Sequence, residues 1–248
     1  MSITDRTTAT KRVPMTSLRK TALAAGVLYL LSFVSIPTLF LYKSVRGPNY
    51  ILGPGPDTAV IFGGVLEMIV ALAGIGTAVA LYPVVKRQNE GVALGFVGAR
   101  TLEGATIVVG VASLLSVVAL RQAGAGTNAL VTGQALVAFY GILFLLSQSF
   151  IPAVNALLLG SLLYRSRLVP RWLPVLGFIG AALLVIAFAI SLAHPGGHVS
   201  ALSGLFAVPI ATWEFSLGVY LIVKGFKPSP ITAGMTAEIR TAHQDTAV

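Results

Sequence analysis

The chain contains no cysteine and few charged residues. Among its 248 residues Cys is absent, and Asp, Glu, Lys and Arg together make up only 10%. Without cysteine there is no disulfide, thiolate metal site, iron–sulfur cluster or cysteine nucleophile. A soluble domain carries about 25% charged residues, so a water-facing surface of ordinary polarity is excluded as well. The scarcity of charge excludes a soluble globular protein, a disordered chain and a coiled coil.

Long apolar runs make up most of the sequence, and 56% of the residues are hydrophobic. A helix needs about 20 apolar residues to cross a hydrocarbon core roughly 30 Å thick. None of the runs has the period-two alternation of a barrel strand. We therefore predict an all-α polytopic membrane protein, a bundle of six transmembrane helices. The helices are expected at residues 21–42, 58–82, 92–120, 135–164, 173–192 and 202–223.

The net charge of +9 is distributed unevenly between the two sides of this bundle. Thirteen of the 17 Lys and Arg residues lie in the terminal segments and in the loops on the same side as the termini. The opposite loops hold only Lys43, Arg46 and Arg121. By the positive-inside rule, both termini are predicted to be cytoplasmic. The basic excess is thus a topology signal with contact to anionic membrane lipids as a secondary effect, and it requires no nucleic acid.

The two ends of the chain differ in composition from the apolar spans. They are rich in Thr, Ala and charge and lack apolar periodicity, which is typical of flexible tails. We predict a flexible basic N-terminal tail (1–19), one six-helix transmembrane domain (20–226) and a flexible C-terminal tail (227–248). The sequence does not determine the oligomeric state.

Two histidines, His194 and His198, lie in the loop before the last predicted helix. Pro and Gly between them disfavour a regular helical pair, and no third ligand is evident. No nucleotide-binding, zinc-protease or serine-hydrolase motif occurs in a suitable context. The sequence therefore predicts no metal site and no cofactor.

Four ionisable residues fall inside predicted helices: Glu67, Arg100, Glu103 and Glu214. Each costs about 2.5–3.5 kcal/mol at the centre of a bilayer. At 1.5 Å per residue all four can occupy one layer near the middle of the membrane. Each glutamate also lies on a stripe of Gly and Ala, and such stripes let transmembrane helices approach closely. We expect one polar cluster inside the bundle.

The charges of this cluster do not balance. Three carboxylates and one guanidinium leave two excess negative charges if every group ionises. Arg100 and Glu103 are i,i+3 neighbours and are expected to pair. One or both of the other glutamates are then expected to hold a proton, which a neutral acid can donate. An intramembrane cluster of this kind favours a functional role, and the alternative is that it holds three helices in register.

Other polar residues extend the candidate site. Pro152 cannot donate to the carbonyl of Gln148, so the fourth span is expected to kink there. Gln148 and Asn155 are candidate polar contacts in the same cavity. Trp213, beside Glu214, is either a pocket-lining residue or packed against a neighbouring helix.

Several segments occur in an order that resembles a known bacterial family. They are TALAAGVLYLL at Thr21–Leu31, GARTLE at Gly98–Glu103, NALLLGSL at Asn155–Leu162, RSRLVPRWLPVL at Arg165–Leu176 and LIVKG at Leu221–Gly225. Over residues 20–226 the chain resembles the integral membrane proteins of domain of unknown function 4386, for which the resemblance implies no established activity. Glu67, Arg100 and Glu214 match acidic, Arg and Glu positions of that family. Asn155 stands where relatives often have His, which puts a His-dependent site in doubt.

Three functions fit these features. The first is binding or transport of a small or lipidic ligand at Glu67, Arg100, Glu103, Gln148, Asn155, Trp213 and Glu214, with proton coupling. The second is a membrane-embedded enzyme that uses one of the three glutamates as general acid and another as base on a prenyl or lipid substrate. The third is an accessory subunit with a structural cluster. An apolar cavity open to lipid favours a lipid binder or enzyme, a polar path to both faces favours transport, and tight packing around a paired cluster favours the subunit.

Overall fold

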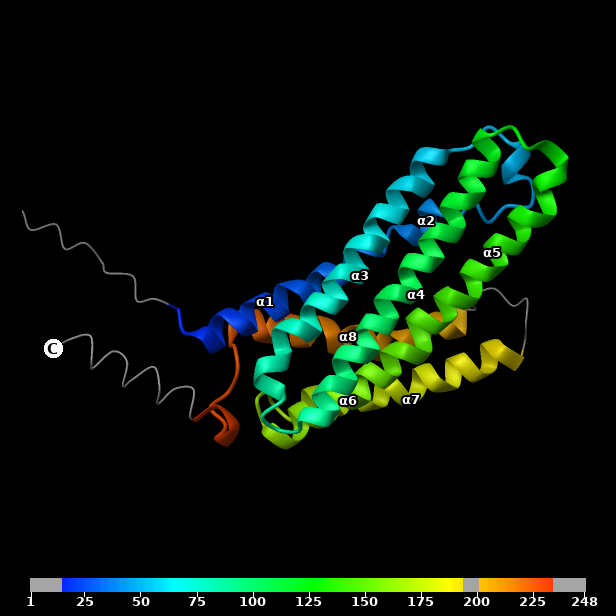
Figure 1. The fold of residues 1–248 in the computed structure, drawn as a ribbon. Helices are drawn as coiled ribbons and strands as arrows, with labels where there is room; N and C mark the ends of the chain where they lie inside the picture. Colours follow the sequence, from blue (N-terminus) through cyan, green and yellow to red (C-terminus); the bar gives the residue numbers. More distant parts are fainter. Residues whose placement is uncertain (1–14, 194–200, 234–248) are drawn as a thin grey trace, which may run out of the picture.

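The computed structural model describes residues 15–193 and 201–233, and this part of the chain is helical without a strand. Six helical spans in it are long and apolar enough to cross a membrane. The predicted all-α polytopic bundle is therefore confirmed (Figure 1). The helices are α1 (Ser17–Leu31), α2 (Thr38–Leu41), α3 (Asp57–Val85), α4 (Glu90–Gln122), α5 (Leu130–Leu145), α6 (Ile151–Ser166), α7 (Trp172–Ala193) and α8 (Ala201–Val223).

Two of the six spans are interrupted near a proline. The first consists of α1, a 3₁₀ turn at Ser32–Ser35 and the short α2, which begins directly after Pro37. The fourth consists of α5, one π-helical turn at Leu146–Phe150 and α6. Because Pro152 has no N–H to donate, the wider π turn takes up the mismatch in the hydrogen-bond ladder. The irregularity expected at Pro152 is present as this turn.

Both described ends of the chain lie at the same end of the bundle, as six crossings require (Figure 1). We call it the terminal end, and we call the opposite end, with residues 42–56 and 123–129, the loop end. Parts of both predicted tails belong to the described structure. Helix α1 begins at Ser17, and the Lys227 amide donates to the Leu168 carbonyl at 2.8 Å. The rest of the predicted tails, 1–14 and 234–248, and both His194 and His198 lie outside the described residues.

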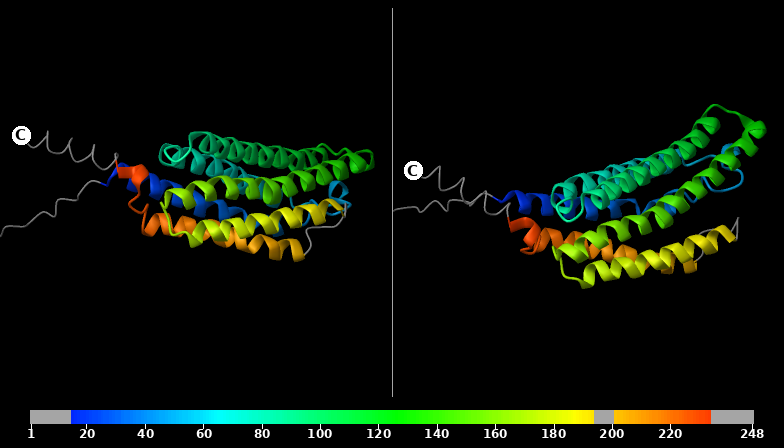
Figure 2. Two further views of the ribbon diagram at one scale, coloured as in Figure 1. Left: turned by 90° about the horizontal axis from the view of Figure 1, so that it is seen from below. Right: turned by 60° about the horizontal axis from the view of Figure 1, so that its bottom comes forward.

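The helices pack around a core that is continuous at the terminal end. Helix α1 lies between α3 and α8, α4 contacts α3, α5 and α6, and α7 lies between α6 and α8. Large buried side chains such as Phe96, Leu159 and Trp213 fill this core. Towards the loop end, α3, α4 and α5 diverge from α7 and α8 (Figure 2). A second core with Tyr42, Leu114 and Tyr140 forms there.

A pair of glycines brings α1 and α8 into close contact. A Cβ atom on Gly26 would lie 2.7 Å from the carbonyl oxygen of Gly218, so Gly26 has no room for a side chain, and a Cβ atom on Gly218 would lie only 3.0 Å from Leu30 Cδ2. Close approach through small residues is typical of transmembrane helix pairs. Tyr29 and Glu214 are about one turn away from these glycines on the same helix faces. The contact therefore places both polar side chains between α1, α4 and α8.

Candidate functional site

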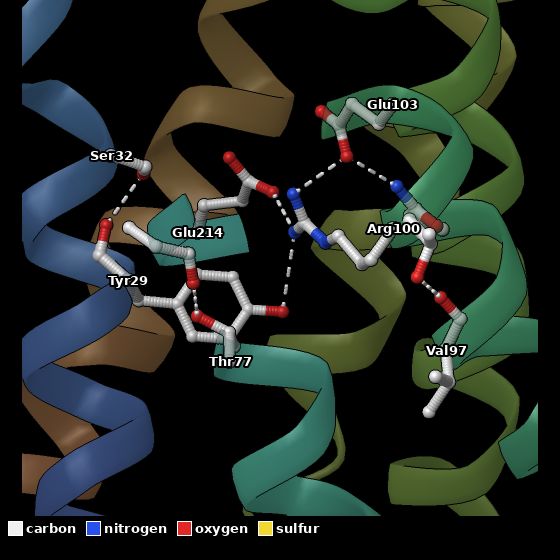
Figure 3. Close-up of polar contacts among 10 residues, drawn as sticks. Tyr29, Ser32, Thr77, Val97, Arg100, Glu103 and Glu214 are labelled. Carbon is white, nitrogen blue, oxygen red and sulfur yellow. Dashed lines mark hydrogen bonds and ion pairs between the residues drawn. The ribbon is translucent and has the colours of Figure 1, made fainter. Parts of the chain in front are cut away.

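The Arg100 side chain is the centre of a buried polar cluster. Only 5% of this residue is exposed. Its Nη1 lies 3.0 Å from Glu103 Oε2 on the same helix, and its Nη2 lies 2.6 Å from Glu214 Oε1 on α8 (Figure 3). Nη2 also donates to the Tyr29 hydroxyl on α1 at 3.5 Å. The predicted pair of Arg100 and Glu103 is present, and the guanidinium joins α4 to α1 and α8.

Asn155 connects the same cluster to α6. Its side chain is fully buried, and its Nδ2 donates to Glu103 Oε2 at 2.7 Å. One carboxylate oxygen of Glu103 thus accepts from both Arg100 and Asn155. We call Tyr29, Arg100, Glu103, Asn155 and Glu214 the Arg100 cluster. It contains one cation and two carboxylates, contributed together with their neutral partners by four helices.

The Arg100 cluster lies near the middle of the spans measured from the terminal end. Arg100 is ten residues after Glu90, and Glu214 is nine residues before Val223. At 1.5 Å per residue both lie roughly 15 Å from the terminal end of their helix. This is about half the thickness of a hydrocarbon core. The predicted mid-membrane position therefore fits the length of these helices.

Glu67 lies outside this cluster. On α3 it is Gly74 that faces Arg100, because a Cβ atom there would lie 3.9 Å from Arg100 Cδ. Glu67 is seven residues away, or roughly 10 Å further towards the loop end. The prediction that all four charged residues form one cluster is wrong for Glu67. Helices α3 and α4 have 29 and 33 residues, more than a membrane requires, so a depth counted from the loop end, as for Glu67, does not coincide with one counted from the terminal end.

Glu67 instead pairs with a tyrosine of α5. The Tyr140 hydroxyl donates to Glu67 Oε1 at 2.8 Å, and both residues are buried. The Tyr42 ring packs edge-on against Tyr140, with ring centroids 5.6 Å apart. The guanidinium of Arg46 lies 5.4 Å from the centre of the Tyr140 ring and 5.9 Å from that of Phe144. We call Tyr42, Arg46, Glu67 and Tyr140 the Glu67 cluster.

A cavity of about 580 Å³ lies beside the Glu67 cluster, at the loop end. Its walls are the segment after α2, one face of α5, and the last residues of α7. Most of the lining is apolar, and Tyr140 belongs both to this wall and to the Glu67 cluster. The lining includes Arg46, Tyr50, Gln134, Tyr140, Gly141, Ile142 and Leu145.

The segment that forms one wall of the cavity is anchored to α3 and α4. Arg121 forms an ion pair with Asp57, and its Nε donates to the Gly53 carbonyl at 2.9 Å. The Tyr50 hydroxyl donates to Asp57 Oδ1 at 2.6 Å. Burial, together with the neighbouring Asp57 carboxylate, raises the pKa of Tyr50 above its ordinary value. Its phenol therefore stays protonated and keeps this bond.

Gln148 and Trp213 lie apart from the Arg100 cluster. Gln148 is exposed on the π turn and borders a small pocket beside Glu67. Trp213 is 1% exposed and packs against α7, where a Cβ atom on Gly177 would lie 2.8 Å from its ring. Of the two alternatives predicted for Trp213, this geometry matches packing against a neighbouring helix. Of the seven predicted site residues, four belong to the Arg100 cluster and one to the Glu67 cluster, whereas Gln148 and Trp213 belong to neither.

Four residues of these clusters were not predicted as site residues: Tyr29, Tyr42, Arg46 and Tyr140. A phenol hydroxyl in an apolar span needs an acceptor, and acidic side chains in other spans are natural partners. Tyr29 and Tyr140 were identifiable by this rule. Arg46 was interpreted only as a topology signal, because no sequence spacing relates it to α5.

The fold and the buried charges define a multi-pass membrane protein. A family model described as "Domain of unknown function (DUF4386)" matches residues 24–225, which is most of the chain. The protein therefore belongs to this family, as the order of its segments indicated. No curated protein and no solved structure gives a match.

Proposed function

We propose that the protein binds a lipidic ligand within the membrane, in the cavity at the loop end. The observation that carries this proposal is the cavity itself, about 580 Å³ with a mainly apolar lining. Small-molecule sites typically measure about 300–1,000 Å³ and combine apolar walls with a few polar groups. Arg46, Gln134 and Tyr140 are such polar groups here.

The position of the cavity supports entry of the ligand from the bilayer. Helix α5, which forms one wall, exposes Val131, Phe139 and Ile142 on its surface. Ile142 also lines the cavity. A surface of this kind faces hydrocarbon in a membrane, so a lipid chain can pass beside α5 without crossing water. This geometry favours a lipid binder over a transporter that needs a polar path to both faces.

The Arg100 cluster supports a different role, that of a structural brace. Arg100, Glu103 and Glu214 are paired with one another and do not line the cavity. Their hydrogen bonds join α1, α4, α6 and α8. The ligand therefore occupies the loop end in this proposal, and the ion pairs keep the helices in register. The enzyme alternative finds less support, because none of the three glutamates is among the residues that line the cavity.

Proton coupling is a second part of the proposal, and Glu67 is the acid concerned. Tyr140 lines the cavity and donates to Glu67, so a ligand that displaces the phenol changes the surroundings of the carboxylate. The other polar groups of the cluster are Tyr42 and Arg46. For an uncharged lipidic probe such as hexadecanol, we expect affinity to vary with pH in the wild type and not in Glu67→Gln. Equal pH dependence in both proteins contradicts coupling at Glu67.

The orientation in a bacterial cytoplasmic membrane, with cytoplasmic termini, is also part of the proposal. It is supported by the charge at the terminal end: Arg19, Lys20, Lys86, Arg87, Arg165, Arg167, Arg171, Lys224 and Lys227. Because the chain has no cysteine, single cysteines report topology without further changes. A membrane-impermeant thiol reagent should label Lys43→Cys in intact spheroplasts and Arg87→Cys only after lysis. The reverse pattern contradicts this orientation.

Ligand binding is tested by filling the cavity. Gly141 lines it, and a Cβ atom at this position would meet no atom within 4 Å, so Gly141→Leu extends into open space. Gly98 on α4 is equally open, does not line the cavity, and supplies the matched control Gly98→Leu. Native mass spectrometry should detect a copurified lipid on the wild type and on Gly98→Leu, but not on Gly141→Leu. The same lipid content in all three proteins contradicts the proposal.

A further inference from the structure

We infer that the ligand of this cavity is a single-chain amphiphile with an anionic head group, a carboxylate or a phosphate, bound by Arg46. The inference rests on the proposed function, since it needs the cavity to hold a ligand. It adds the chemical class of the ligand and the residue that selects it.

The first observation is that Arg46 is an exposed cation without an ion pair. In the described part of the chain, Arg100 and Arg121 form ion pairs with acidic residues, whereas no ion pair involves Arg46. Of the two acidic residues nearest to it along the bundle, Glu67 accepts from Tyr140, and Asp57 binds Arg121 and Tyr50. An anionic ligand supplies the partner that the neighbouring side chains of Arg46 do not.

The second observation is the way in which Arg46 is held. Its guanidinium lies over the faces of Tyr140 and Phe144, 5.4 and 5.9 Å from the ring centres. Such cation–π contacts orient the group without using its N–H donors. A guanidinium has five donors in a fork that matches a carboxylate or phosphate. Arg46 is therefore placed at the cavity wall with its donors available for the head group.

The third observation is the distribution of polar groups around the cavity. Arg46 is the one charged side chain among the described residues that line the cavity, and apolar residues such as Ile142 and Leu145 form most of the rest of the wall. This arrangement suits a ligand with one polar end and one hydrocarbon chain. A volume of about 580 Å³, well within the range for one drug-sized molecule, suits a single chain better than a two-chain phospholipid.

Three probes with the same hydrocarbon chain separate the head-group chemistry: palmitate, hexadecyl phosphate and hexadecanol. Their equilibrium binding is measured on the purified full-length protein, for the wild type, Arg46→Gln and Lys43→Gln. Lys43 is an exposed cation of the same segment that does not line the cavity, so Lys43→Gln is the matched control. The stronger of the two anionic probes shows whether the protein prefers a carboxylate or a phosphate.

We expect the wild type to bind both anionic probes more tightly than hexadecanol. Arg46→Gln should weaken anionic binding by about tenfold or more, as expected for a charge-assisted hydrogen bond, and should leave hexadecanol unchanged. Lys43→Gln should bind like the wild type. The assignment of an anionic head group is wrong if the wild type binds palmitate and hexadecanol equally well. It is also wrong if Arg46→Gln binds palmitate as tightly as the wild type does.

The Gly141→Leu variant distinguishes this failure from failure of the proposed function. If all probes bind the wild type better than Gly141→Leu but Arg46→Gln has no effect, the cavity holds a ligand and only the anionic assignment is wrong. If no probe distinguishes the wild type from Gly141→Leu, the cavity is not a ligand site. A dimer that Gly141→Leu disrupts, in the absence of probe binding, assigns the cavity to a second copy of the chain and overturns both proposals.

Discussion

Replacing Arg100 with leucine removes the one cation that Glu103 and Glu214 share. In the wild type, Nη1 and Nη2 of Arg100 contact one glutamate each, at 3.0 and 2.6 Å. The side chains of the two acids are 11% and 19% exposed, so water cannot replace the guanidinium effectively. The variant leaves two carboxylates close together in the bundle without a counter-charge.

The expected loss of stability is large. Removal of one partner of a buried ion pair typically costs about 3–5 kcal/mol, and here two pairs share the lost partner. A folded domain is stable by only about 5–15 kcal/mol, so Arg100→Leu should lose about a third of that or more. Glu103 retains its bond from Asn155, whereas Arg100 is the hydrogen-bond partner seen for Glu214. Glu214 should therefore be the more destabilising of the two after the substitution.

Reversible unfolding in mixed micelles, titrated with a denaturing detergent, measures these differences. Starting from Arg100→Leu, adding Glu214→Gln should restore more free energy of unfolding than adding Glu103→Gln. Adding Glu67→Gln should restore none, because Glu67 pairs with Tyr140. The assignment of these pairs is refuted if Arg100→Leu unfolds like the wild type. It is also refuted if only Glu67→Gln restores the free energy of unfolding of Arg100→Leu.

Three further substitutions test other parts of the structure. Tyr140→Phe leaves Glu67 without its hydroxyl donor and should cost about 1–3 kcal/mol in the same unfolding assay; a loss equal to zero contradicts the pair. Gly26→Leu should lower Tm by crowding α8, with Gly98→Leu as the open-position control, and equal Tm values argue against the close contact. Arg121→Gln should release the segment 43–56 and speed its proteolysis, and an unchanged cleavage rate contradicts the anchoring role.

The six spans were predictable because each depends on the hydrophobicity of one continuous stretch of sequence. Each needs about 20 apolar residues, and each is bounded by polar or turn-forming segments. The pair of Arg100 and Glu103 was predictable for a similar reason, since i,i+3 residues adjoin on any helix. Glu214 was assigned correctly to the same cluster because it lies on the small-residue stripe that ends at Gly218.

The position of Glu67 and the cavity were not predictable in this way. The depth of Glu67 depends on how far α3 extends beyond the membrane, which is a property of the packed bundle. The contact between Arg46 and Tyr140 joins a loop to a helix almost a hundred residues later, and no local pattern encodes it. The cavity depends on the divergence of α5 from α7, which arises only when all helices are packed (Figure 2).

The central claim, that a lipid chain occupies the cavity at the loop end, is tested most directly by photolabelling in liposomes. The probe is palmitate with a photoreactive diazirine in its chain, and mass spectrometry maps the labelled residues. Labels should concentrate on the cavity-lining face of α5, around Gln134 to Leu145, and should decrease in Gly141→Leu but not in Gly98→Leu. Labels spread evenly over lipid-exposed residues such as Leu94 and Leu102 on α4, and unchanged in Gly141→Leu, would contradict it.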